Sequence, residues 1–80
     1  MNDDLRKRAH DVDATLRVGK GGIESVADEL STQLGERELV KVKFLRSARG
    51  GTTTGELAEA LAERVGADLV EQRGHTAVFH

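Results

Sequence analysis

The chain has 80 residues and a mass of 8.7 kDa, of which 38% are hydrophobic and 32% charged, with a formal net charge of −2. This length predicts one small domain over residues 1–80, and the composition supplies enough apolar side chains for a core. Cysteine is absent, which excludes disulfides, thiolate metal sites and a cysteine nucleophile. No apolar run is long enough to span a membrane and the acidic start does not resemble a secretory signal, so we expect a cytoplasmic protein.

The first part of the chain predicts a helix, a strand and a loop. Residues 3–11 are mostly polar, with Leu5 and Ala9 four positions apart, which is typical of a short helix. Residues 14–18 alternate between apolar and polar side chains and predict a strand. Residues 19–22, Gly-Lys-Gly-Gly, predict a loop because three glycines would weaken any regular element.

The clearest predicted helix covers residues 23–36. Its apolar side chains recur at helical spacing and form one stripe: Ile23, Val26, Ala27, Leu30 and Leu34. Gly35 is placed to end this helix.

A strand, a loop and a second helix follow. Residues 39–45 predict a strand, since apolar side chains alternate with two lysines. Residues 46–53 predict a loop. Residues 54–66 predict a helix with leucines and valine at four-residue spacing, capped by Thr53 or Thr54.

The last elements are two short strands, at residues 68–73 and 76–79, joined by a tight turn at residues 74–75. The element order is therefore α-β-α-β-α-β-β. The strand–helix–strand unit requires a parallel pair of strands, and the final hairpin adds antiparallel ones. We expect an α/β fold, a two-layer sandwich with a mixed four-stranded sheet.

Charge is distributed in blocks along the chain. Residues 37–53 carry five basic side chains and one acidic one, whereas residues 23–36 carry four acidic and no basic side chains. A fold that gathers the basic residues would be bipolar and could bind a polyanion despite a sequence pI of about 5.9. Phe44 and Phe79 are the only aromatic residues, so RNA would be bound through phosphates, backbone amides and shape rather than by base stacking.

The glycine-rich loop has the character of an anion site. Free amide groups at the start of the following helix are expected to point into it, and Lys20 adds a cation. A Walker A motif needs different spacing, and a dinucleotide fingerprint would place Glu24 where a third glycine belongs. The remaining pattern is G-x-x-G, formed by Gly19 and Gly22, which binds the RNA backbone in KH modules but there joins two helices. The alternative is a glycine-rich connection without a ligand.

Further basic residues are predicted to lie close to this loop. Because parallel strands end at the same edge of a sheet, the loop that carries Arg46 and Arg49 should adjoin the glycine loop. Lys43 should lie close behind, on one strand face. The alternative for the lysines is an ordinary solvated sheet face. The candidate RNA-contacting residues are Arg17, Gly19, Lys20, Gly21, Gly22, Lys41, Lys43, Arg46 and Arg49.

Four segments of the chain resemble one known family. They are Ala9-His10, residues 16–23 (Leu-Arg-Val-Gly-Lys-Gly-Gly-Ile), residues 38–43 (Glu-Leu-Val-Lys-Val-Lys) and residues 74–79 (Gly-His-Thr-Ala-Val-Phe). Together they resemble the CRM domain (chloroplast RNA splicing and ribosome maturation), whose stand-alone prokaryotic members are called YhbY-like. The resemblance extends from about residue 5 to residue 80.

The resemblance implies a fold similar to the C-terminal domain of bacterial translation initiation factor three. It also implies RNA binding, with residues 19–22 as the contact loop and basic residues nearby assisting. Stand-alone members are associated with precursors of the large ribosomal subunit, and plant members with group II intron splicing. This chain departs from the family pattern in lacking proline and in its negative net charge.

The sequence offers no arrangement suited to catalysis. His10, His75 and His80 are scattered without metal-ligand spacing, so we expect no metal, no cofactor, no small-molecule substrate and no enzymatic activity. The leading hypothesis is a monomeric RNA-binding protein that binds ribosomal RNA of the large-subunit precursor during ribosome assembly. The alternatives are a protein-interaction module whose acidic helices bind a basic ribosomal protein and, less favoured, a small-nucleotide sensor.

Overall fold

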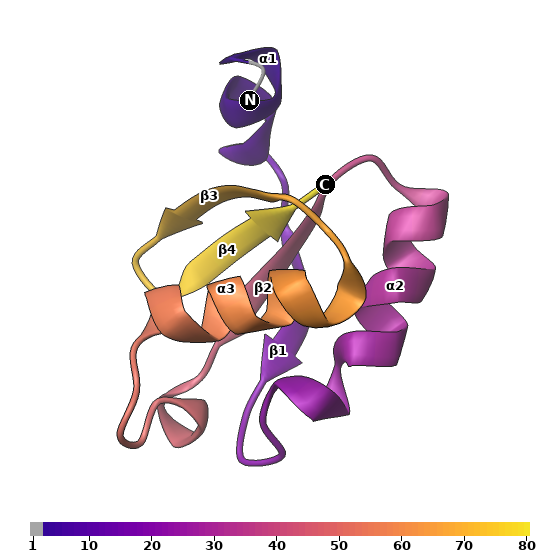
Figure 1. The fold of residues 1–80 in the computed structure, drawn as a ribbon. Helices are drawn as coiled ribbons and strands as arrows, with labels where there is room; N and C mark the ends of the chain where they lie inside the picture. The colour runs from indigo at the N-terminus through magenta and orange to yellow at the C-terminus, as the bar shows by residue number, and fades with distance from the viewer. Residues whose placement is uncertain (1–2) are drawn as a thin grey trace.

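The computed structural model describes residues 3–80. Its elements follow the predicted order, with a single 3-10 turn before α2 and another before α3 (Figure 1). In chain order they are α1 (Asp3–Ala9), β1 (Ala14–Val18), the turn η1 (Ile23–Ser25), α2 (Ala27–Glu36), β2 (Val40–Phe44), the turn η2 (Arg46–Ala48), α3 (Thr54–Val65), β3 (Leu69–Arg73) and β4 (Thr76–Phe79).

The four strands form one mixed sheet in the order β1-β2-β4-β3. β1 and β2 are parallel, and β4 runs antiparallel to both β2 and β3. Strands β1, β2 and β3 therefore finish at the same end of the sheet, which we call the loop end. The turn between β3 and β4 also lies there, since the Phe44 amide donates to the His75 carbonyl oxygen at 2.7 Å. The predicted fold class and element order are confirmed.

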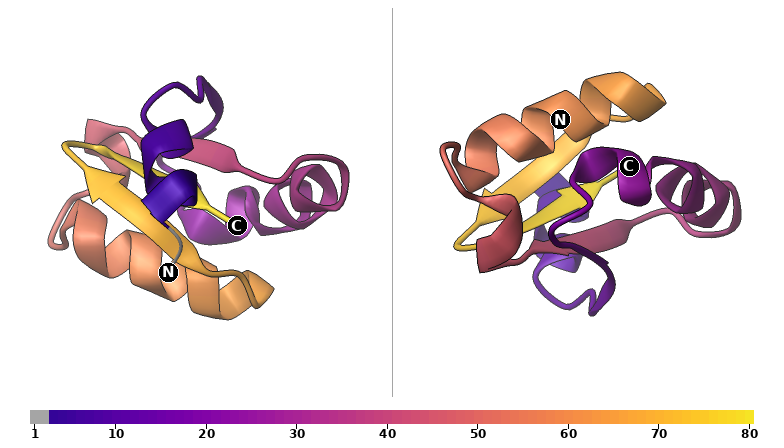
Figure 2. Two further views of the ribbon diagram at one scale, coloured as in Figure 1. Left: turned by 90° about the horizontal axis from the view of Figure 1, so that it is seen from above. Right: turned by 90° about the horizontal axis from the view of Figure 1, so that it is seen from below.

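Helices α2 and α3 cover one face of the sheet, and Figure 2 shows α3 running lengthwise along it. Successive side chains of a strand point to opposite faces, so every second one enters this interface, and in β1 and β2 these side chains are apolar. The largest fully buried side chains of this core come from helices α2 and α3 and from strands β1, β2 and β4: Val18, Leu30, Val40, Val42, Phe44, Leu61 and Phe79.

The short helix α1 packs on the opposite face. Leu5 and Ala9 contact Val70 and Val78, a second apolar cluster that covers the part of this face formed by β3 and β4. The part formed by β1 and β2 stays uncovered and carries Arg17, Lys41 and Lys43, and we call it the open face.

An ion pair ties α1 to the segment before β2. Arg8 Nη1 lies 2.6 Å from Glu38 Oε1. The hydrogen bond and charge of Arg8 lower the pKa of the Glu38 carboxyl, and Glu38 in turn raises the pKa of Arg8. Both side chains are exposed, so this pair orients α1 more than it stabilises the fold.

The helix predicted for residues 23–36 ends where predicted but differs from the structure at its start, and Gly35 does not have the predicted role. Its first residues form η1, and Val26 (φ −117°, ψ −5°) separates that turn from α2. The β-branched Val26 and Ile23 favour a helix weakly, and burial of Val26 in the core outweighs the continuity of the helix. Gly35 does not end the helix, because α2 continues to Glu36 and the Arg37 amide still bonds to the Gln33 carbonyl oxygen.

The caps of α3 agree with the sequence. Thr53 is the N-cap, and its Oγ1 accepts a hydrogen bond from the Glu56 amide at 3.1 Å. Gly66 closes the helix in the left-handed conformation at φ 71°. α3 therefore begins and ends at defined residues, and its first residues lie beside the β3–β4 turn at the loop end of the sheet.

Leu61→Ala tests whether α3 supports the core. Leu61 is fully buried against the sheet, so truncation leaves a cavity and should lower the free energy of unfolding by about 2–5 kcal/mol. Glu59→Ala, at an exposed position of the same helix, is the control and should change it by less than about 0.5 kcal/mol. Urea denaturation measures both, and equal stability of the two variants would refute this packing.

Candidate nucleic-acid interface

The glycine loop, residues 19–22, is a tight turn at the loop end of the sheet. The Gly22 amide donates to the Gly19 carbonyl oxygen at 3.0 Å and closes the turn. Gly22 has φ 72° and ψ −174°, a conformation that is essentially restricted to glycine. At Gly21, a Cβ atom would lie 3.1 Å from Ser25 Cβ, so a side chain there would push against η1. The shape of the turn therefore requires glycine at position 22 and leaves little space for a side chain at position 21.

The turn leaves backbone donors available at its tip. Lys20 and Gly21 are exposed, and within residues 3–80 their amide groups form no backbone hydrogen bond. Ser25 and Val26, the third and fourth residues of the predicted helix, donate to the carbonyl oxygens of Gly22 and Ile23, so these two amides are not available to a ligand. The amides at the tip of the turn are the exposed donors, and α2 begins further along the chain.

A second loop touches the glycine loop, as the sequence predicts. A Cβ atom on Gly19 would lie 3.4 Å from Ser47 Oγ and 3.6 Å from Leu45 Cδ1. The Leu45 amide also donates to the Val18 carbonyl oxygen at 2.8 Å, which holds the ends of β1 and β2 together. The two loops therefore form one continuous surface.

Most of the predicted basic residues gather at this surface. Lys20 and Arg46 are exposed on the two loops. Arg49 is half-buried, and its Nε donates to the Phe44 carbonyl oxygen at 3.3 Å, which holds the guanidinium at the end of β2. Arg17 lies one residue before the end of β1 on the open face.

The two lysines of β2 differ in their position. Lys43 is exposed and lies opposite Arg17, close to the loops. Lys41 is half-buried and lies two residues further from the loop end, opposite Val78. Lys41 is therefore on the same face as the other basic residues but away from the glycine loop.

The acidic side chains lie mainly elsewhere. Glu24, the carboxylate closest in sequence to the glycine loop, forms an ion pair with Arg64 of α3, with Oε1 3.0 Å from Nε. The exposed carboxylates of the two covering helices are Asp28, Glu29, Glu36, Glu56, Glu59 and Glu63. The molecule is therefore bipolar, with acidic groups on the helix layer and basic groups at the loop end and on the open face.

A pocket of about 470 Å³ adjoins this surface and was missed from the sequence. It lies between the start of α3 and the β3–β4 turn, and its lining is polar: Arg49, Thr52, Thr53, Thr54, Gly55, Gln72, Gly74 and His75. Thr54 Oγ1 lies 3.4 Å from His75 Nδ1. The pocket could have been found from the sequence only by pairing β4 with β2, because this antiparallel pairing places residues 74–75 at the loop end.

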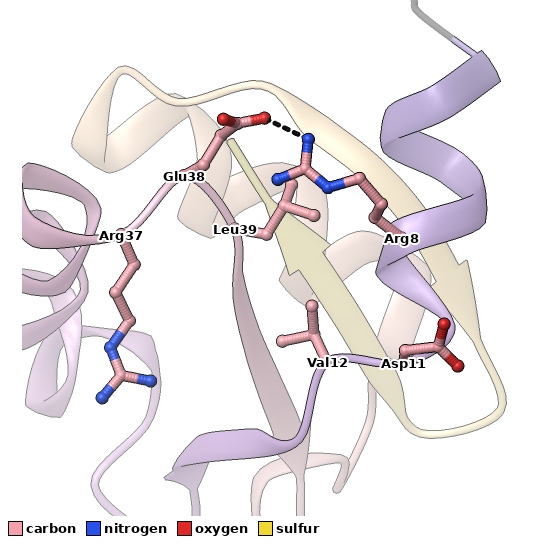
Figure 3. Close-up of a pocket in the computed structure, with 6 residues that line it drawn as sticks. All are labelled: Arg8, Asp11, Val12, Arg37, Glu38 and Leu39. Atoms are coloured by element: carbon pink, nitrogen blue, oxygen red, sulfur yellow. Dashed lines mark hydrogen bonds and ion pairs between the residues drawn. The ribbon is translucent and has the colours of Figure 1, made fainter.

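A second pocket, of about 280 Å³, lies at the other end of β2 (Figure 3). It is lined by Arg8, Asp11, Val12, Arg37, Glu38 and Leu39. Figure 3 shows the Arg37 side chain pointing away from the Arg8–Glu38 ion pair. This pocket is separate from the glycine loop, and Arg37 offers an exposed arginine for comparison.

The part of the chain that the structure describes offers no metal centre and no transmembrane helix. No three His, Asp or Glu side chains among residues 3–80 are grouped so that they could hold a metal ion. None of the described helices is both long enough and apolar enough to cross a membrane.

Comparison with known proteins identifies relatives over nearly the whole chain. The CRS1/YhbY (CRM) domain matches residues 2–80. A "probable RNA-binding protein" of Methanocaldococcus jannaschii is 41% identical over 71 residues, which cover 89% of this chain and 53% of that protein. The "probable RNA-binding protein YqeI" of Bacillus subtilis is 32% identical over 77 residues, which cover 95% of this chain and 78% of that protein.

A solved structure shares the fold. The solution structure of a hypothetical protein of Staphylococcus aureus, described as a candidate RNA-binding protein, superposes with a TM-score of 0.78 at 35% identity. The match covers 98% of this chain and 80% of that protein. This chain spans only about half the length of the Methanocaldococcus relative. The family resemblance stated from the sequence is confirmed.

Gly22→Ala tests the geometry of the turn. No atom lies within 4 Å of the added Cβ, so the substitution acts through the backbone alone and should lower stability by about 1–3 kcal/mol. Gly50→Ala is the matched control, because Gly50 lacks the positive φ and also has space for a Cβ; it should be neutral or stabilising by up to about 1 kcal/mol. Urea denaturation compares them, and a neutral Gly22→Ala would contradict the turn.

Proposed function

This chain belongs to the CRS1/YhbY (CRM) domain family, and we propose that it binds RNA through the glycine loop and the basic residues around it. One observation supports this most: the exposed turn carries Lys20, adjoins the loop of Arg46 and Arg49, and has two amides, of Lys20 and Gly21, that form no backbone hydrogen bond within residues 3–80. The names of both curated relatives describe RNA-binding proteins, which agrees with this proposal.

The proposed mode of binding is electrostatic. The amides of Lys20 and Gly21 donate hydrogen bonds to phosphate oxygens, and the absence of a Cβ at Gly21 lets the RNA backbone approach closely. Lys20 and Arg46 supply mobile cations, while Arg49 is held in place by the carbonyl oxygen of Phe44. Both phenylalanines are fully buried, so base stacking on aromatic rings contributes nothing.

The proposed RNA is ribosomal RNA of the large-subunit precursor, bound by a monomer in the cytoplasm during ribosome assembly. This follows the association of stand-alone members of the family with such precursors. The bipolar charge supports the assignment, since a local basic surface can attract a polyanion even when the net charge is −2.

A second function is favoured by the acidic helix layer. The exposed carboxylates of α2 and α3 could bind a basic ribosomal protein, with the glycine loop serving only as a connection. The two functions differ in which surface is used. Charge reversal at the loop end therefore separates them.

Lys20→Glu should weaken binding of single-stranded RNA by about three- to tenfold, because one exposed charge contact with phosphate contributes about 1 kcal/mol. Lys20 is exposed, so the melting temperature should stay nearly unchanged. Arg37→Glu makes the same change in net charge at the other end of the sheet and should affect binding much less. Filter binding measures both variants.

Equal affinity of Lys20→Glu and the unchanged protein would remove the loop from the site. Equal losses for Lys20→Glu and Arg37→Glu would mean that only net charge matters. Copurification of a basic ribosomal protein that survives nuclease treatment, and is lost when carboxylates of α2 and α3 are neutralised, would favour the protein-interaction function.

The dependence of RNA affinity on salt concentration gives the number of phosphate contacts. Each contact with a single strand contributes about 0.7 to the slope of log affinity against log salt. With roughly three to five contacts, the slope should lie between about −2 and −3.5. Titrations across a range of potassium chloride concentrations measure it, and a flat response would contradict electrostatic binding.

A further inference from the structure

The register of the sheet aligns basic residues across three of its four strands. Arg17 of β1 lies opposite Lys43 of β2, and Lys43 lies opposite Thr76 of β4. Thr76 lies opposite Arg73 of β3. Residues directly opposite each other in a sheet project from the same face, so Arg17, Lys43 and Arg73 lie in one line on the side away from α2 and α3. We call these three residues the basic row.

The basic row continues from the glycine loop. Arg17 precedes Val18, the last residue of β1, and the glycine loop follows directly. Neighbouring strands are about 4.8 Å apart, so three strand spacings give a row of about 14 Å. All three side chains are exposed, and among residues 3–80 neither Arg17 nor Lys43 forms an ion pair. The middle of the row is open to a ligand that lies across the strands.

The far end of the row is held in place by His10, the residue that follows α1. Arg73 Nη1 lies 2.6 Å from His10 Nδ1, and His10 Nε2 lies 3.1 Å from Glu71 Oε2. An arginine can only donate, so Nδ1 must be the unprotonated nitrogen that accepts, and the ring proton is on Nε2, facing Glu71. His10 therefore connects Glu71 to Arg73 and fixes the direction of the guanidinium.

We propose that the RNA strand bound at the glycine loop continues across the open face along the basic row, with Arg73 as a further RNA-binding residue and His10 as the residue that positions it. This inference rests on the proposed function, because it extends the same site. The row binds phosphates, since its side chains are cations and no aromatic ring is exposed on it. The Glu71 carboxylate is paired with His10.

The proposed path of the RNA is tested by measuring how Arg73→Gln changes the affinity for a short and a long RNA probe. The short probe is an oligouridylate of about four nucleotides, which fills little more than the loop, and the long probe has about twelve. Arg73→Gln should weaken binding of the long probe by about threefold, reduce its salt slope by about 0.7, and leave the short probe unaffected. Arg37→Gln, the same substitution at the other end of the sheet, should change neither probe.

The role of His10 is tested by a double-mutant cycle. His10→Ala removes the hydrogen-bond acceptor of Arg73 and should weaken binding of the long probe about as much as Arg73→Gln does. His10→Gln keeps an acceptor and should retain most of the affinity. In the Arg73→Gln background, His10→Ala should cause no further loss. An additive loss would mean that His10 acts separately from Arg73. Melting temperatures identify any variant that fails to fold.

The outcomes separate this inference from the proposed function. If Lys20→Glu weakens both probes while Arg73→Gln changes neither, the loop binds RNA and the path across the open face is wrong. If Lys20→Glu changes neither probe, the proposed function itself fails. If Arg73→Gln weakens both probes equally, Arg73 contributes to the overall field rather than to a path, which also overturns the inference.

Discussion

The hydrogen bond from the Gly22 amide to the Gly19 carbonyl oxygen folds the link between β1 and η1 into a narrow turn, and the proposed binding of RNA depends on it. In this closed turn, the amides of Lys20 and Gly21 have no backbone acceptor within the described chain. Exposed amides are usually solvated at little cost, so the turn can exchange water for phosphate oxygens without rearranging. This arrangement requires glycine at position 22, because its backbone conformation is essentially restricted to glycine.

The topology explains why other groups lie beside this turn. Parallel pairing of β1 and β2 brings the segment at residues 45–49 against Gly19, and antiparallel pairing of β4 brings residues 74–75 to the same end. The helices that make the parallel connections possible cover the other face and carry six exposed carboxylates. Separation of charge is therefore a consequence of the fold, and a small acidic protein can present a basic surface.

Much of this arrangement was predictable from the sequence. Periodicity located β1, β2 and the helix of residues 54–65, because their alternating or helical patterns match their burial in the core, and the turn at residues 74–75 located β3 and β4. The break at Val26 was not predictable, since its spacing also fits a continuous helix and only its contact with the core decides the outcome. The contribution of Arg73 and His10 was missed because these residues are 63 positions apart and meet only through strand register and the packing of α1.

The most direct test follows the backbone amides while single-stranded RNA is added. In a series of nitrogen–proton correlation spectra, the account predicts that the Lys20 and Gly21 amide protons shift downfield as they bond to phosphate oxygens, with smaller changes at Arg46 and Arg49. It also predicts that amides along the outer surfaces of α2 and α3 stay unchanged. Shifts confined to those two helices, with the signals of residues 19–22 unmoved at saturation, would contradict it.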